Sequence, residues 1–227
     1  MPKTHYPVDT EDVMKELCRV DRRLAKIIRR VGSFPTKRQK PQLPFQSLLQ
    51  SIVYQQLAGK AAQTIFGRVK ALAADGKFPT PQEILLMDAT KLRAAGLSRQ
   101  KIAAAKDLAA RTLDGTVPTL AKLRRMSEEE IHERLVQVRG IGTWSVQMFL
   151  MFRLGRPDVL PIHDLGIRKG FQLVYGHKDV PKPEFILQHG ERWRPYRSIA
   201  SWYLWRAVDQ ARIKAKRQQQ QTKKRMS

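Results

Sequence analysis

Apolar residues recur every three or four positions through most of the chain, which is the spacing of one buried face of an α-helix. The pattern is regular over residues 10–31, and Gly32 supplies a helix end. It resumes over residues 45–58 and 62–76, on either side of Gly59. No stretch alternates apolar and polar residues convincingly with a period of two. We therefore expect an all-α fold of about ten helices joined by short loops.

Short polar motifs mark where further helices begin, because a side-chain oxygen at that position accepts hydrogen bonds from the first helical amides. Two motifs, beginning at Thr80 and Ser127, are capping boxes with a glutamate three residues later. Asp88 and Ser98 predict two more helix starts. We expect the helix that begins after Ser127 to reach Val138.

The charge of the chain indicates the class of its partner. The sequence has 43 Lys and Arg against 20 Asp and Glu, a formal net charge of +23 at pH 7. Such an excess is typical of proteins that bind a polyphosphate. The single cysteine, Cys18, and five scattered histidines argue against a disulfide, an iron–sulfur cluster or a zinc site.

The sequence also predicts where the protein is found. The N-terminus lacks the apolar core of a signal peptide. No apolar run approaches the roughly 20 residues that a membrane span needs. We expect a soluble intracellular protein without a membrane partner, in the cytoplasm or nucleoid of a prokaryote or the nucleus of a eukaryote.

The last residues differ in composition from the rest of the chain. After Asp209 there are seven basic residues and no acid: Arg212, Lys214, Lys216, Arg217, Lys223, Lys224 and Arg225. The pattern predicts a frayed helix that passes into a disordered basic tail at residues 211–227. A solvated terminus without a specific role and a nucleic-acid-binding arm both remain open.

The most specific local motif is a turn with two glycines, Arg139-Gly140-Ile141-Gly142, between two predicted helices. Glycines permit a positive φ and the close approach of another backbone. The first amides of the helix that begins at Thr143 attract an anion. These features suit a DNA phosphate that is held without regard to base sequence. The alternative is a tight helix connection in which the glycines serve geometry only, but the net charge and the flanking arginines favour phosphate binding.

A second motif, Pro161-Ile162-His163-Asp164, brings two polar residues to the start of a predicted helix at residues 165–175. Asp164 is a suitable N-cap for that helix. A carboxylate at this place, shortly after a phosphate-binding turn, is also suited to face a bound DNA strand. His163 either orients a phosphate or tunes the carboxylate, or it is a packed polar neighbour. The residues alone leave these alternatives open.

Together these motifs give the chain a family resemblance. It resembles the helix-hairpin-helix (HhH-GPD) DNA glycosylase superfamily, and within it the 3-methyladenine DNA glycosylase II branch, over roughly residues 10–210. The motifs that carry the resemblance are Val138–Trp144, Leu160–Asp164, Tyr54–Leu57 with Lys60–Ala62, Gly96–Lys101, and Trp193–Ser198 with Trp202 and Trp205.

The resemblance implies a two-lobed helical fold with the active-site cleft between the lobes and no N-terminal β domain. Residues 1–44 would form an N-terminal helix and linker that pack with the C-terminal lobe. Residues 45–160 would form the central lobe with the hairpin, and residues 161–210 the catalytic segment and C-terminal helices. The basic tail would follow at residues 211–227.

The resemblance also assigns roles to individual residues. Asp164 falls on the catalytic aspartate, and Gln56 or Leu57 on the wedge that fills the space left by an extruded base. We expect a base pocket formed by Trp144, Trp205, Met148, Tyr54 and His163. We expect DNA contacts from Gln56, Leu57, Arg139, Gly140, Ile141, Gly142, Thr143 and Lys101. Trp202, three residues from Trp205 on one helix, we interpret as core.

No cofactor is expected for catalysis. The backbone carbonyls of Val136, Val138 and Ile141 would hold a monovalent cation, Na⁺ or K⁺, that helps to bind a phosphate. Family members that also cleave the DNA backbone have a lysine nucleophile at the position of Trp144, so a Schiff base has no amine here. Arg139 stands where family members often have a proline, and we expect it to add a phosphate contact.

The resulting expectation is a monomeric, monofunctional glycosylase that acts on double-stranded DNA containing damaged bases. An ionised Asp164 would assist a water in the hydrolysis of alkylated purines of the 3-methyladenine and 7-methylguanine type. The alternatives are a non-catalytic, lesion-sensing DNA-binding protein on the same scaffold and a bifunctional glycosylase/lyase.

Overall fold

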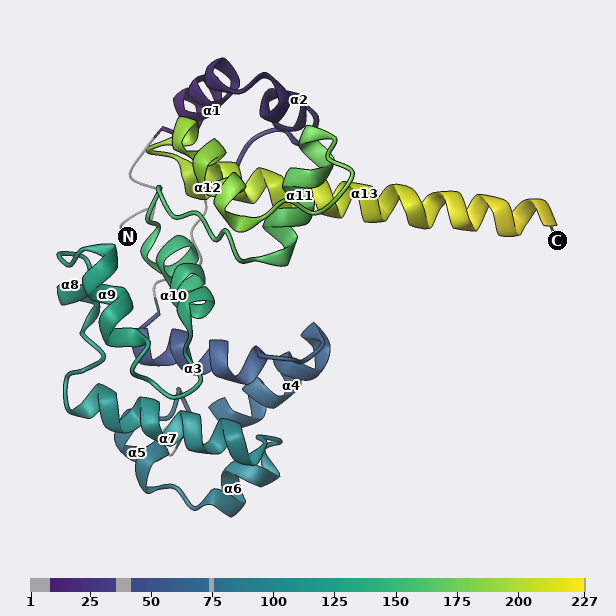
Figure 1. The fold of residues 1–227 in the computed structure, drawn as a ribbon. Coiled ribbons are helices and arrows are strands. Elements are labelled where there is room, and N and C mark those ends of the chain that lie inside the picture. Colours follow the sequence, from purple (N-terminus) through teal and green to yellow (C-terminus); the bar gives the residue numbers. More distant parts are fainter. Residues whose placement is uncertain (1–8, 36–41, 74–75, 227) are drawn as a thin grey trace. The chain divides into compact units, whose positions relative to one another are not determined.

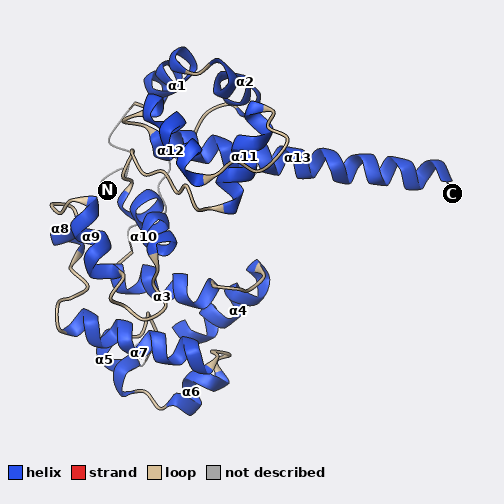
Figure 2. Cartoon of the chain, viewed as in Figure 1, coloured by secondary structure: helices blue, strands red, loops and turns tan. Residues whose placement is uncertain are grey.

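The structure is a computed structural model that describes residues 9–35, 42–73 and 76–226, with side chains up to residue 221. In these ranges every regular element is a helix, and no strand is found (Figure 2). The all-α prediction is confirmed, although thirteen α-helices exceed the expected number, partly because the chain has several helices of only one or two turns. None of these helices is long and apolar enough to cross a lipid bilayer.

The chain divides into two compact units (Figure 1). Unit 1 comprises the described residues 9–35 and 155–226. Its elements are α1 (Thr10–Val20), α2 (Arg22–Val31), α11 (Leu165–Tyr175), α12 (Pro183–Gly190), the 3₁₀-helix η2 (Glu191–Trp193) and α13 (Arg197–Met226).

Unit 2 comprises the described residues 42–73 and 76–154. Its elements are α3 (Pro44–Tyr54), α4 (Gly59–Lys70), α5 (Pro81–Leu86), α6 (Ala89–Ala94), α7 (Arg99–Leu113), α8 (Leu120–Leu123), α9 (Glu128–Leu135), α10 (Thr143–Phe149) and the π-helix η1 (Leu150–Leu154). The central helix α7 packs against α3 and α5.

The N-terminal helix of unit 1 is interrupted, and the prediction of one helix over residues 10–31 is wrong. Asp21 has an extended backbone (φ −144°, ψ 98°) and separates α1 from α2. Its carboxylate accepts hydrogen bonds from the amides of Arg23 and Leu24, so it caps the second helix. Gly32 ends α2 with φ 82°, as predicted.

Asp21 is held by residues far away in the sequence. Its side chain is 3% exposed, and its Oδ2 accepts hydrogen bonds from the Tyr175 hydroxyl at 2.5 Å and the Trp193 indole at 3.0 Å. His189 Nε2 lies 3.0 Å from the same oxygen. Burial opposes ionisation, but the contacts with His189, the Leu24 amide, Tyr175 and Trp193 outweigh it and hold the pKa of Asp21 well below its usual range.

The helix α13 packs closely on α11 and then continues far beyond the rest of unit 1 (Figure 1). A Cβ on Gly170 would lie 2.2 Å from the Leu204 carbonyl oxygen, so only glycine permits this approach of the two helices. The prediction of a disordered tail is wrong for residues 211–226, which continue α13. This stretch contains no glycine or proline, and it is rich in the good helix formers Lys, Arg, Gln and Ala.

Four helices of unit 2 begin where the sequence predicts. Capping boxes form at Thr80 and Ser127, and Asp88 and Ser98 cap the helices that follow them. Two predicted ranges need correction. The helix expected over residues 62–76 is Gly59–Lys70, because Gly59 begins this helix instead of interrupting it. The helix expected to reach Val138 ends at Leu135, and consecutive turns follow it.

Candidate functional site

The turn with two glycines lies in unit 2 between α9 and α10. Gly140 has φ 80°, and Gly142 precedes α10 as an N-cap without a side-chain hydrogen bond. Val138 and Ile141 are buried, 1% and 3% exposed, whereas the glycines are exposed. The two apolar side chains therefore fix the turn to the core, and its glycines and the first amides of α10 face solvent, where they are suited to bind a phosphate.

Two residues that the sequence analysis did not assign hold this turn in place. The Arg139 amide donates a hydrogen bond to Asp107 Oδ2 at 2.7 Å, and the Gly140 carbonyl accepts one from Gln55 Nε2 at 2.8 Å. Gln55 lies within a motif that already carried the resemblance. Asp107 lies on α7, 32 residues from Arg139, and no local pattern marks it.

The carbonyls expected to bind a cation are compatible with that role. The Val138 carbonyl accepts one hydrogen bond, from the Ile141 amide at 3.0 Å, and retains a second lone pair. In the described part of the chain, the carbonyls of Val136 and Ile141 accept no hydrogen bond. The assignment stays a prediction.

The expected wedge residues lie in the loop between α3 and α4. Gln56 has φ 57°, the single positive φ of a non-glycine residue within the described ranges. A side chain in this conformation indicates a backbone that its surroundings hold in a strained state. Gln56 and Leu57 are both exposed. The strained backbone therefore presents two exposed side chains.

Lys101 supports this loop from α7. Its Nζ donates hydrogen bonds to the carbonyls of Val53 at 2.8 Å and Gln55 at 2.7 Å, and burial lowers its pKa. The ammonium therefore satisfies main-chain oxygens at the end of α3. The direct DNA contact expected of Lys101 stays a prediction; the geometry gives it a positioning role for the loop.

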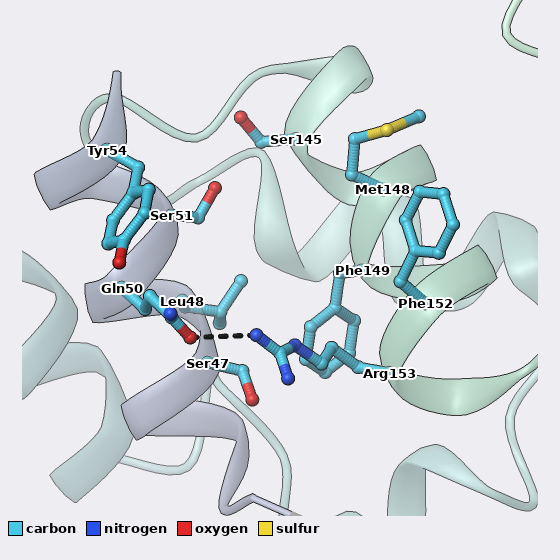
Figure 3. Close-up of a pocket in the computed structure, with 10 residues that line it drawn as sticks. All are labelled: Ser47, Leu48, Gln50, Ser51, Tyr54, Ser145, Met148, Phe149, Phe152 and Arg153. Atoms are coloured by element: carbon cyan, nitrogen blue, oxygen red, sulfur yellow. Dashed lines mark hydrogen bonds between the residues drawn. The ribbon is translucent and has the colours of Figure 1, made fainter. Parts of the chain in front are cut away.

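A cavity of about 300 Å³ opens between α3 and the segment α10–η1 (Figure 3). It brings together two expected pocket residues, Tyr54 and Met148. Its other lining residues are Ser47, Leu48, Gln50, Ser51, Ser145, Phe149, Phe152 and Arg153. Gln50 and Arg153, which no sequence motif marks, are joined by a hydrogen bond of 2.8 Å from Arg153 Nη2 to Gln50 Oε1. Trp144 is 48% exposed and does not line this cavity.

Asp164 begins α11 in unit 1. Its Oδ1 accepts hydrogen bonds from the Ile167 amide at 2.8 Å and from Trp205 Nε1 at 2.9 Å. The predicted N-cap is confirmed. The side chain is half-buried, and the neighbouring His163 is exposed. The N-cap role of Asp164 is therefore compatible with the catalytic role expected of it. Both hydrogen bonds go to Oδ1 and fix the carboxylate in one orientation.

Gly166 permits the contact between Asp164 and Trp205. A Cβ at this position would lie 2.7 Å from Trp205 Cδ1 and 2.9 Å from Asp164 Oδ1. Gly166 was not among the residues predicted for the site. Trp202, in contrast, packs edge-on against Phe34 with ring centroids 5.1 Å apart, so its interpretation as core is confirmed.

The family described as HhH-GPD superfamily base excision DNA repair protein matches residues 49–195. The DNA-3-methyladenine glycosylase 1 of Schizosaccharomyces pombe is 39% identical over 188 residues, which cover 82% of each chain.

Two solved structures are similar over most of their length. The S. pombe 3-methyladenine DNA glycosylase, solved in complex with abasic DNA, has a TM-score of 0.78 and 38% identity, covering 86% of this chain and 95% of its own. A DNA-3-methyladenine glycosidase from Bacillus halodurans has a TM-score of 0.77 and 32% identity, covering 91% and 92% respectively.

Proposed function

The chain belongs to the HhH-GPD superfamily of base excision DNA repair proteins, and we propose that it is a monofunctional glycosylase for alkylated purines in double-stranded DNA. It acts as a monomer and releases bases of the 3-methyladenine and 7-methylguanine type. The observation that carries this proposal is the carboxylate of Asp164, oriented at the start of α11 by the Ile167 amide and the Trp205 indole.

Binding begins with the DNA backbone. The exposed turn at Gly140 and Gly142 and the amides at the start of α10 bind a phosphate without contacting a base. The carbonyls of Val136, Val138 and Ile141 would hold a Na⁺ or K⁺ ion, which supplies positive charge next to that phosphate.

The damaged nucleotide must then leave the helix stack, which costs a few kcal/mol. Gln56 or Leu57, presented by the strained loop, fills the space that remains. The backbone of this loop is already held in place by Lys101 at the carbonyl of Gln55. Little ordering entropy is therefore lost when the loop enters the DNA.

Asp164 serves the chemical step. Alkylation at N3 or N7 makes the purine cationic and therefore a good leaving group, so little general-acid assistance is needed. Positive charge develops on the sugar as the glycosidic bond breaks. An ionised Asp164 stabilises that charge and orients the attacking water.

Backbone cleavage by a Schiff base requires an amine at the sugar. The segment from Leu135 to Trp144 contains no lysine. By resemblance to the family, Trp144 corresponds to the lysine nucleophile of bifunctional members. We therefore expect no covalent adduct with DNA when borohydride is added, and no strand nicking before alkaline treatment.

The decisive experiment is Asp164→Asn. Asparagine keeps the Oδ1 acceptor for Ile167 and Trp205 but removes the charge. Single-turnover release of 3-methyladenine should fall on the order of 10²–10⁴-fold, whereas affinity for DNA with an abasic site should change little. Asp179→Asn, which removes an exposed charge from the same unit, is the matched control.

Full activity of Asp164→Asn would refute the assignment and favour a different catalytic group. Absence of base release by the wild type would favour a lesion-sensing protein.

A further inference from the structure

The cavity between α3 and α10–η1 contains a positive charge that the release of cationic bases does not require. Arg153 contributes its guanidinium to the lining (Figure 3). Burial lowers its pKa, but an arginine side chain stays protonated at neutral pH. Among the described residues no carboxylate forms an ion pair with it, and its hydrogen bond to Gln50 goes to a neutral amide.

Gln50 fixes the orientation of this guanidinium. An arginine N–H only donates, so the group of Gln50 that faces Nη2 at 2.8 Å is its oxygen. The amide nitrogen of Gln50 and the other N–H groups of Arg153 are then donors. This end of the cavity is therefore rich in hydrogen-bond donors.

The remaining lining completes a site for a flat ring. Leu48, Met148, Phe149 and Phe152 supply apolar and aromatic surface, and a volume of about 300 Å³ lies at the lower end of small-ligand pockets. A planar heterocycle with a carbonyl group fits this cavity, because its faces pack on the apolar side chains and its carbonyl oxygen accepts hydrogen bonds from the donors of Arg153 and Gln50. A planar cation without a carbonyl meets a like charge in a partly desolvated site.

We propose that Arg153, oriented by Gln50, is a specificity-determining residue that favours extruded bases with a ring carbonyl and disfavours cationic bases without one. The inference rests on the proposed function, because it takes this cavity, which contains Tyr54 and Met148, as the place of the extruded base. Asp164 performs the chemistry on every substrate, and Arg153 sets the relative rates.

The test uses four duplexes that vary charge and carbonyl independently. The lesions are 3-methyladenine (cationic, no carbonyl), 7-methylguanine (cationic, carbonyl), hypoxanthine (neutral, carbonyl) and 1,N⁶-ethenoadenine (neutral, no carbonyl). Single-turnover rates and KM values, corrected for spontaneous loss of the base, are compared for the wild type and Arg153→Met, a variant of similar length without charge or donors.

For Arg153→Met we expect hypoxanthine release to fall about tenfold and 3-methyladenine release to rise several-fold, in line with the net contribution of a single hydrogen bond. For 7-methylguanine the loss of the hydrogen bond to the carbonyl and the loss of the like charge offset each other. The rate of ethenoadenine release should change least. Arg153→Lys keeps the charge, so its rate of 3-methyladenine release should stay close to that of the wild type. Gln50→Met shifts the ratios in the same direction as Arg153→Met but by less, because it only releases the guanidinium.

An equal loss on all four lesions, or no change on any, overturns the proposal, since a structural role cannot accelerate 3-methyladenine release. Circular dichroism and affinity for abasic DNA confirm that the variants fold. Failure of the proposed function is distinguishable: in that case the wild type releases no alkylated base. If the wild type is active and Asp164→Asn is not, but Arg153→Met leaves the four ratios unchanged, only the inference about Arg153 fails.

Discussion

Two aspartates of unit 1 have the same local role and different surroundings. Asp21 caps α2 and Asp164 caps α11, each through Oδ1 and an amide three residues on. Asp21 is 3% exposed, and Tyr175, His189 and Trp193 contact its second oxygen. Asp164 is half-buried, beside an exposed histidine. The comparison shows that the cap motif alone does not distinguish the two residues. The side chains that surround the carboxylate decide whether it is buried in the core or stays partly exposed.

The largest expected effect is a difference between Asp21→Asn and Asp164→Asn in the free energy of unfolding. Asp21→Asn replaces an ionised acceptor by an amide whose N–H₂ faces the donors of Tyr175 and Trp193, so we expect a loss of about 3–5 kcal/mol in the free energy of unfolding. Asp164→Asn should cost less than about 1 kcal/mol, because asparagine is an equally good cap. Urea denaturation followed by circular dichroism measures both. Equal losses would show that Asp164 is also a structural residue.

Acid should affect the two aspartates differently. The pKa of Asp21 is lowered in the folded state relative to its ordinary 3.8, so its stabilisation is present above that pH and is lost as the pH falls below it. The loss is about 1.4 kcal/mol for each pH unit in that range. Denaturation of the wild type and Asp21→Asn between pH 5 and 2 should converge towards acid. A difference in stability that is independent of pH would contradict an ionised Asp21.

Gly166→Ala tests the contact with Trp205 that orients Asp164. The added methyl group meets Trp205 and Asp164 Oδ1 at less than 3 Å, so the indole or the carboxylate must move. We expect base release to fall about tenfold, with little effect on DNA affinity. Gly67→Ala, at a helical glycine with open space around it, is the control. Unchanged catalysis would show that the contact between Asp164 and Trp205 is dispensable.

The smallest expected effect concerns the basic extension of α13. Arg212, Lys214, Lys216 and Arg217 are exposed on a helix. If they bind phosphates, changing all four to glutamine lowers the slope of log K against log salt by about 0.9 for each phosphate that is no longer neutralised. The single-turnover rate at saturating enzyme should not change, in contrast to Asp164→Asn. An unaltered salt slope would identify the extension as a solvated helix without a role in binding.

Several features of the fold and of the site were predictable because their contacts are local. The helix starts at Thr80, Ser127 and Asp164 depend on a side chain and an amide a few residues away, so short motifs reveal them. The turn at Gly140 follows from its glycines and the adjoining helices. The all-α fold follows from apolar spacing that extends along the chain.

Other features depend on partners that no local pattern contains. The break at Asp21 interrupts a regular helical pattern because residues more than 150 positions away satisfy the carboxylate. Asp107 matches an ordinary charged position of a helix, and Lys101 was expected to contact DNA. Instead, Asp107 holds the turn at Arg139, and Lys101 holds the loop at Gln55. At the end of α13 the run of basic residues predicted disorder, whereas the helix propensity of the same residues predicts the helix that the structure shows.

By itself the sequence determined the helical class, the positions of most caps, the turn with two glycines and the family to which the chain belongs. Only the tertiary structure decided that Gly166 lets Trp205 reach Asp164 and that Arg153 and Gln50 meet in one cavity. The physical reason is the range of the interactions. Caps and turns form between neighbours along the chain, whereas close approaches and cavities arise where separate helices pack, and their geometry is fixed by all of the surrounding side chains together.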